Sequence, residues 1–88
     1  MTVQELNTVL GNNIKFYRQL KNMDQPQLAE ELDINPYQVW QWEKGRAFVR
    51  SSNLPLLAQI LGVEVWELFY NGKVVLEGDE KLFCRGNT

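Results

Sequence analysis

The fold of this chain is decided by residues 24–45, DQPQLAEELDINPYQVWQWEKG, which predict two short helices joined by a tight turn. Asp24 is a good N-cap residue, and Gln27 three positions later can complete a capping box. Leu28 and Leu32 place apolar side chains on one face of the first helix. Because helices of about two turns are not stable alone in water, both must pack against neighbours.

The second helix of this stretch has one face for the core and another that stays free. Asn35 is suited to cap it, and Pro36 sits in its first turn, where the missing N–H costs nothing. Val39 and Trp42 share one face, and Gly45 can end the helix in a left-handed conformation. We therefore expect a firmly held helix whose exposed side can bind another molecule.

These residues resemble the helix-turn-helix signature of the phage repressor (Cro and cI) family. Asp33 stands where that signature has its turn glycine, and Asn35 stands where it has a serine cap; both can serve the same backbone role. Residues 54–68 resemble the closing two helices of the same domain, so the likeness covers about residues 10–71. It implies an all-α, five-helix lambda-repressor-like helix-turn-helix domain. The positions that carry the signature are Gln25, Leu28, Ala29, Leu32, Ile34, Val39, Trp42, Glu43 and Gly45.

We expect this domain to span residues 1–72. Before the motif, the apolar pattern predicts one long helix or two abutting ones, because Gly11 interrupts it. Residues 46–53 lack helical periodicity and predict a loop. Two further helices should follow it, over residues 54–61 and residues 65–70.

Several side chains outside the motif have expected positions as well. Ile14, Tyr17 and Leu20 should face the core from the region before the motif, whereas Val3, Leu6 and Val9 fit simple core or dimer packing. Ser52 or Asn53 should cap the fourth helix, and Trp66 and Phe69 should point into the core.

Residues 73–88 form a separate tail in this interpretation. Within it, KVVLEGDEKLFCR predicts two short strands around Gly78 and Asp79, a C-terminal β-hairpin. An isolated hairpin is barely stable, so it must pack on the helices or pair with another chain. A dimerising strand and a packing flap both remain open.

Composition excludes several function classes. The chain has no histidine and a single cysteine, Cys84, so it lacks an ordinary acid–base pair, a histidine ligand for zinc and an internal disulfide. We expect no enzyme, no metal, no cofactor and no small-molecule ligand. No apolar run is long enough to span a membrane, and the N-terminus carries no basic signal region, so we expect a cytoplasmic protein. The net charge of −2 does not favour DNA, so a basic face must come from folding.

The resemblance assigns roles to the free face of the second motif helix. That helix should enter the major groove of DNA, where a glutamine can bond bidentately to adenine. Trp40 lies at the groove-facing side of the helix or at its edge. The expected base contacts are Pro36, Tyr37, Gln38, Trp40 and Gln41, although Pro36 fits a helix-starting role equally well.

Other residues should grip the phosphate backbone or brace the fold. By resemblance, Gln25 bonds the DNA backbone and braces a base-reading side chain, and Arg18 and Glu43 form a structural ion pair. The expected backbone contacts are Gln25, Lys44, Arg46, Arg50, Ser51 and Ser52.

Two functions fit these observations. The first is a sequence-specific double-stranded DNA-binding transcriptional repressor of phage or prophage type, acting as a homodimer on a palindromic operator. The second is a protein-binding module, an inhibitor or antitoxin-like adaptor that kept the fold and lost the DNA. The acidic net charge, Pro36 and the exposed aromatic residues Tyr37 and Trp40 favour the second.

Overall fold

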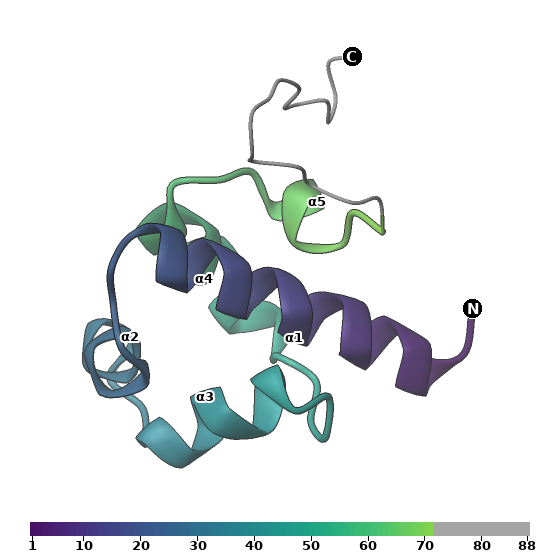
Figure 1. Cartoon of the computed structure of the whole chain (residues 1–88), viewed down its shortest axis with the longest axis horizontal. Helices are drawn as coiled ribbons and strands as arrows, with labels where there is room; N and C mark the ends of the chain where they lie inside the picture. The colour runs from purple at the N-terminus through teal and green to yellow at the C-terminus, as the bar shows by residue number, and fades with distance from the viewer. Residues whose placement is uncertain (72–88) are drawn as a thin grey trace.

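One long helix and four shorter ones make up residues 1–71, the part of the chain that the computed structural model describes (Figure 1). No strand occurs within these residues, and the hairpin predicted for residues 73–85 lies outside them. The elements are α1 (Val3–Leu20), α2 (Gln25–Leu32), α3 (Pro36–Glu43), the 3-10 turn η1 (Ser51–Asn53), α4 (Leu54–Leu61) and α5 (Val65–Leu68).

Helix α1 is continuous. It begins with a capping box, in which Thr2 Oγ1 accepts a hydrogen bond from the Glu5 N–H (3.0 Å) and Glu5 Oε1 accepts one from the Thr2 N–H (2.7 Å). Gly11 does not break the helix. It is buried against α3, and a Cβ built on it would overlap the carbonyl oxygen of Trp42. Glycine is therefore required here for close approach of two helices.

The turn between α2 and α3 forms as the sequence predicts. The Asp24 carboxylate accepts a hydrogen bond from the Gln27 N–H (2.8 Å), and the Asn35 side chain accepts one from the Tyr37 N–H (2.8 Å). Asp33 ends α2 in the left-handed region, with φ of 58°, and Gly45 does the same after α3, with φ of 73°. Asp33 and Asn35, which lie between the two helices, set the angle at which α3 leaves α2.

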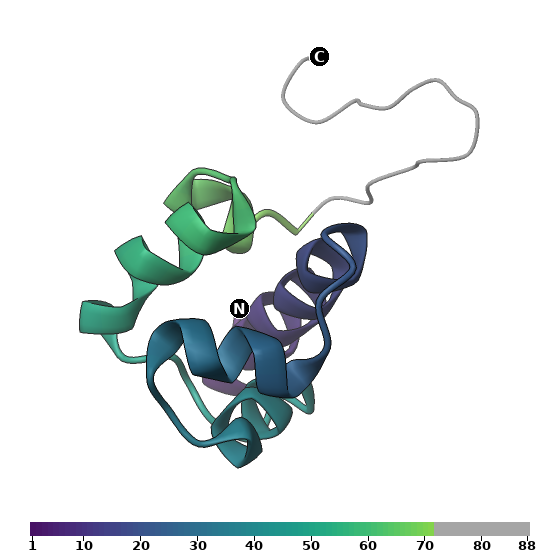
Figure 2. The same cartoon turned by 90° about the vertical axis from the view of Figure 1, so that its left-hand side faces the viewer.

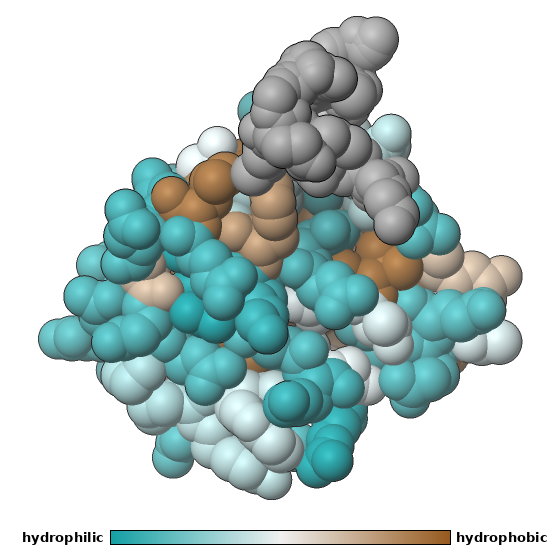
Figure 3. Space-filling model, viewed as in Figure 1, coloured by the Kyte–Doolittle hydropathy of each residue, from teal (hydrophilic) through white to brown (hydrophobic). Residues whose placement is uncertain are grey.

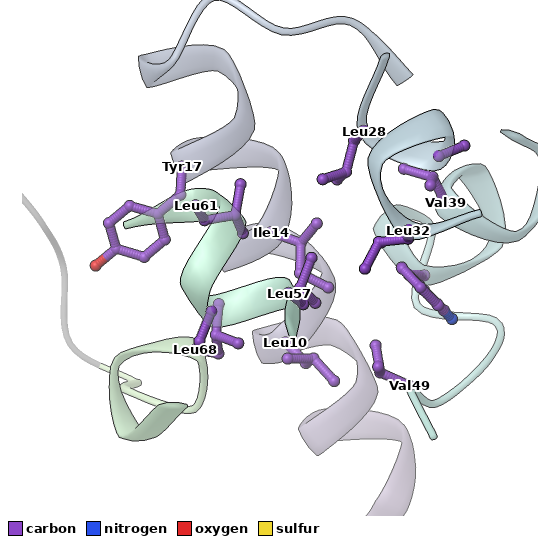
Figure 4. Close-up of a cluster of buried hydrophobic side chains, with 13 residues drawn as sticks. Leu10, Ile14, Tyr17, Leu28, Leu32, Val39, Val49, Leu57, Leu61 and Leu68 are labelled. Atoms are coloured by element: carbon purple, nitrogen blue, oxygen red, sulfur yellow. The ribbon is translucent and has the colours of Figure 1, made fainter. Parts of the chain in front are cut away.

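Helix α1 runs through the middle of the described residues. Helices α2 and α3 lie together at the end of the molecule opposite α5 (Figure 2). Leu10 and Ile14 of α1 lie between side chains of the motif helices and side chains of α4 and α5 (Figure 4). Burying a leucine or isoleucine stabilises the fold by about 1.5–3 kcal/mol. The fully buried large side chains are Leu10, Ile14, Leu28, Val39, Val49, Leu57 and Leu68.

Some side chains predicted to face inward are exposed. Leu20 is 55% exposed, because the core contacts only the middle of α1, from Leu10 to Arg18. Val3 is 73% exposed, so of its two expected roles only dimer packing stays a prediction. Trp66 is 52% exposed on α5, so its predicted inward position is wrong, whereas Phe69 packs partly against the core.

The entry to α4 also differs from prediction. The last three residues of the predicted loop form η1, which leads directly into α4. Neither Ser52 nor Asn53 caps α4 through its side chain: Asn53 lies at the N-cap position with no side-chain cap hydrogen bond. A 3-10 turn continued by a helix provides backbone hydrogen bonds in place of a side-chain cap.

Candidate nucleic-acid interface

Helix α3 is held from its inner side by packing. Val39 is fully buried and Trp42 is 4% exposed, and the backbone of Trp42 lies against Gly11 of α1. Gln4 Nε2 of α1 donates to the carbonyl oxygen of Gly45 (3.1 Å), just after the helix ends. The inner face and the C-terminal end of α3 therefore have fixed partners.

A buried ionic network fixes the same helix from the side. Arg18 of α1 donates to both carboxylate oxygens of Glu43, at 2.6 and 3.0 Å, and to the carbonyl oxygen of Met23 at 2.8 Å. The two charged side chains are only 9% and 4% exposed. A bidentate arginine–carboxylate pair of this kind restricts both position and angle.

Gln25 joins this network. Its amide nitrogen donates to Glu43 Oε1 at 2.9 Å, so α1, α2 and α3 meet at one carboxylate. The resemblance assigned to Gln25 the bracing of a base-reading residue. In this structure its amide nitrogen braces Glu43, whose side chain is 4% exposed.

The outer side of α3 is open to solvent. Tyr37 is 58% exposed, and Pro36, Gln38 and Lys44 are exposed as well. In Figure 3 the lower edge of the molecule, where α3 lies, is coloured from teal to white, the range of polar residues, tyrosine and tryptophan. The free face is thus polar and aromatic, with few aliphatic side chains.

Gln41 is less accessible than the sequence predicts. It is half-buried, and its amide oxygen is fully buried with no hydrogen-bond partner among the described residues. It borders a shallow groove of about 270 Å³ between α3 and the segment that follows it. Side chains lining this groove include Tyr37, Gln38, Gln41, Phe48 and Arg50.

The segment after α3 carries cations beside this groove. Four of the residues expected to contact the DNA backbone are exposed here: Arg46, Arg50, Ser51 and Ser52. Together with Lys44 they give α3 and the segment after it three exposed cations, of which Arg50 lines the groove. The exposed acidic residues Glu30, Glu31 and Asp33 lie on α2 and its end.

Trp40 forms a cluster on the edge of this face. Its ring stacks on that of Tyr37, with centroids 5.5 Å apart and planes inclined by 18°. The Arg46 guanidinium carbon lies 5.0 Å from the indole centroid, and Lys44 Nζ lies 5.8 Å from it. Trp40 itself is half-buried, so it is less exposed than its neighbour Tyr37.

Sequence reasoning missed two residues, one beside the groove and one at α5. Phe48 is 45% exposed, borders the groove and lies 6.3 Å from the ring of Phe69. Asn13 of α1 donates to the carbonyl oxygens of Leu68 (2.7 Å) and Tyr70 (3.0 Å) and thereby ties down the end of α5. Phe48 lies in an aperiodic segment, and Asn13 is one of two adjacent asparagines, so neither gave a recognisable pattern.

The fold and this face define a helix-turn-helix domain of the transcription-regulator type. A helix-turn-helix domain family matches residues 11–73, most of the chain, and the chain belongs to that family. No curated protein matches the chain.

Solved structures resemble it over most of its length. A hypothetical transcription factor, NHTF from Neisseria, is 28% identical with a TM-score of 0.70, over 80% of each chain. The restriction-modification controller protein C.AhdI from Aeromonas hydrophila is 28% identical with a TM-score of 0.67, over 72% of this chain and 96% of that one. The hydroxypropylphosphonic acid epoxidase from S. wedmorenis is 27% identical with a TM-score of 0.69, but only 35% of that chain is covered.

The first two similarities span nearly whole regulator chains and the third spans a part of an enzyme. The comparisons therefore point to a regulator and not to an enzyme. Within residues 1–71, no helix has the length and apolar content needed to cross a membrane.

Proposed function

We propose that this chain is a sequence-specific double-stranded DNA-binding transcriptional repressor, of the phage repressor (Cro and cI) type, that acts as a homodimer on a palindromic operator. The observation that carries the proposal is the contrast between the two sides of α3. Its inner side is fixed by Val39, Trp42 and the Arg18–Glu43 pair, and its outer side presents exposed polar side chains next to exposed cations. A rigid helix with such a face suits the major groove.

Base contacts in this proposal come from Pro36, Tyr37, Gln38 and Gln41. Gln38 is exposed and can bond bidentately to adenine, which is worth about 1–3 kcal/mol of discrimination. Gln41 must rotate outward to reach a base. Because its amide oxygen has no partner within the described residues, that rotation breaks no hydrogen bond to this oxygen. Pro36 can contribute only apolar contact with a thymine methyl group.

Backbone contacts come from Lys44, Arg46, Arg50, Ser51 and Ser52. These groups position the protein on the duplex and carry no direct sequence information. Gln25 can donate to a phosphate oxygen only with the amide hydrogen that Glu43 does not occupy. Residues 1–72 are the DNA-binding unit in this proposal, and residues 73–88 are a tail that pairs with a second chain or covers the helices.

The proposal is tested by selecting bound fragments from random duplex DNA and measuring affinity for the selected site and a scrambled duplex. Gln38→Ala should reduce the preference for the selected site, because it removes a base contact. Arg46→Ala should weaken binding to both duplexes alike, because it removes a phosphate contact. Lys21→Ala is the control, since Lys21 is exposed at the end of α1 and its ammonium lies beside Gly62 at the end of α4.

The same measurements separate the rival function. A protein-binding module would show equal, weak affinity for the selected and scrambled duplexes, and the Gln38 and Arg46 variants would behave like the wild type. The similarity to the epoxidase supports a role of this fold outside gene regulation, since a comparable domain forms part of a protein that is not named as a regulator.

A further inference from the structure

We infer that Trp40 is a positioning residue, which holds Arg46 and Tyr37 in the conformations that contact DNA and does not itself read a base. This inference rests on the proposed function and changes the role that the sequence gave to Trp40. The geometry that carries it is the cluster on one indole: the stacked Tyr37 ring at 5.5 Å, the Arg46 guanidinium at 5.0 Å and the Lys44 ammonium at 5.8 Å.

The indole is poorly placed to read a base edge. Trp40 is half-buried at the side of α3, whereas Tyr37 and Gln38 are exposed. Its only polar group is a single N–H donor, which cannot make the bidentate contacts that distinguish base pairs. The indole ring already contacts one aromatic and two cationic side chains of the protein, which leaves little of its surface for a base.

Arg46 gains most from this arrangement. An exposed arginine loses considerable rotamer freedom when it binds a phosphate, and that loss weakens binding. A cation–π contact with the indole, whose centroid lies 5.0 Å from the guanidinium carbon, restrains the Arg46 side chain, and its N–H groups can still donate to phosphate oxygens. The conformation of the Arg46 side chain is therefore restricted before DNA binds.

Tyr37 is held by the same ring. It lies one turn before Trp40 on α3, and the near-parallel planes, inclined by 18°, restrict the direction of its side chain. Its hydroxyl end remains exposed, since the residue is 58% exposed. One half-buried residue thus positions a base contact and a backbone contact together.

The first test replaces the ring in the full chain. Trp40→Leu keeps apolar volume but removes the aromatic face, and should weaken affinity for the selected duplex about tenfold. The salt slope should fall in magnitude by about 0.9 per subunit, as one phosphate contact is lost. Trp40→Phe should restore most of the affinity. In the free protein, the Arg46 Hε NMR resonance should be shifted upfield by the indole ring current and should lose this shift in Trp40→Leu.

A double-variant cycle shows whether Trp40 acts through Arg46. Arg46→Ala added to Trp40→Leu should weaken binding much less than Arg46→Ala does alone, because the contact is already lost. Multiplicative effects of the two changes, or an unchanged Arg46 Hε shift in Trp40→Leu, would overturn the inference.

A second pair of variants applies if Trp40→Leu does not fold. Arg46→Lys keeps the charge but removes the planar guanidinium that contacts the Trp40 ring, and should weaken binding severalfold. Arg50→Lys is the matched comparison at another proposed backbone contact in the same segment. No cation–π contact of Arg50 is found among the described residues, so this change should weaken binding less than Arg46→Lys does. Equal effects of the two changes would overturn the inference while leaving the proposed function intact. A wild-type chain that does not prefer its selected duplex would instead overturn the proposed function, and the inference with it.

Discussion

At the residue scale, Gly11 decides how closely α1 approaches α3. Alanine has the higher helix propensity by about 1 kcal/mol, so an exposed Gly→Ala change would stabilise α1. Here the new Cβ would overlap the backbone carbonyl of Trp42, which cannot move as a flexible side chain could. We predict that Gly11→Ala lowers the free energy of unfolding by about 1–3 kcal/mol in a urea titration.

The control for this change is Asn12→Ala, one residue along the same helix at an exposed position. It should leave the stability equal or slightly higher. A Gly11→Ala variant as stable as the wild type would show that the two helices do not touch at this point.

Glu43 is the second residue whose replacement should be costly. Glu43→Ala leaves Arg18 buried without a carboxylate, and breaking a buried pair from one side costs about 3–5 kcal/mol. The exposed Glu30 on α2 provides the comparison, because Glu30→Ala should change the free energy of unfolding by less than about 0.5 kcal/mol. If urea titrations gave equal and small losses in the free energy of unfolding for the two variants, the buried network around Glu43 would be contradicted.

At the element scale, the turn between α2 and α3 depends on one backbone conformation. Asp33 adopts φ of 58°, where any Cβ is unfavourable and a short polar side chain is better tolerated than an aliphatic one. We predict that Asp33→Gly is more stable than Asp33→Ala by about 1 kcal/mol, measured by thermal or urea unfolding.

Glu30 gives the matched comparison inside α2. At that helical position the order should reverse, with Glu30→Ala more stable than Glu30→Gly by about 1 kcal/mol. The same order at both sites would mean that the turn is not left-handed at Asp33.

These elements also show what the sequence could and could not predict. The caps at Asp24 and Asn35 and the helix end at Gly45 depend on side chains and backbone conformations within a few residues, so local pattern was sufficient. The roles of Gly11 and Trp66 depend on which helices meet in three dimensions, and periodicity does not contain that information.

The interface was predictable to a similar degree. Helical spacing correctly separated buried Val39 and Trp42 from exposed Tyr37 and Gln38. It could not predict that Gln41 would be half-buried, because the segment that borders it has no periodic pattern.

At the scale of the whole molecule, the basic groups predict how binding depends on salt. The proposed interface has three exposed cations in each chain, Lys44, Arg46 and Arg50, which give six in a homodimer. The logarithm of the binding constant should then fall against the logarithm of salt concentration with a slope of roughly −5. Anisotropy titrations over a salt series measure this slope, and sedimentation should give two chains per selected duplex. A slope near zero would contradict the proposed phosphate contacts. One chain per duplex would contradict the homodimer proposal.

The central claim is that the outer side of α3 and the segment after it are the surface that meets DNA. Backbone NMR of the full chain, titrated with the selected duplex, tests this most directly, with the scrambled duplex as reference. The largest amide shifts are expected at Tyr37, Gln38 and Arg46, and the scrambled duplex should produce much smaller ones. If those amides stay unchanged while the duplex shifts others, or if the duplex shifts none, the proposed interface is wrong.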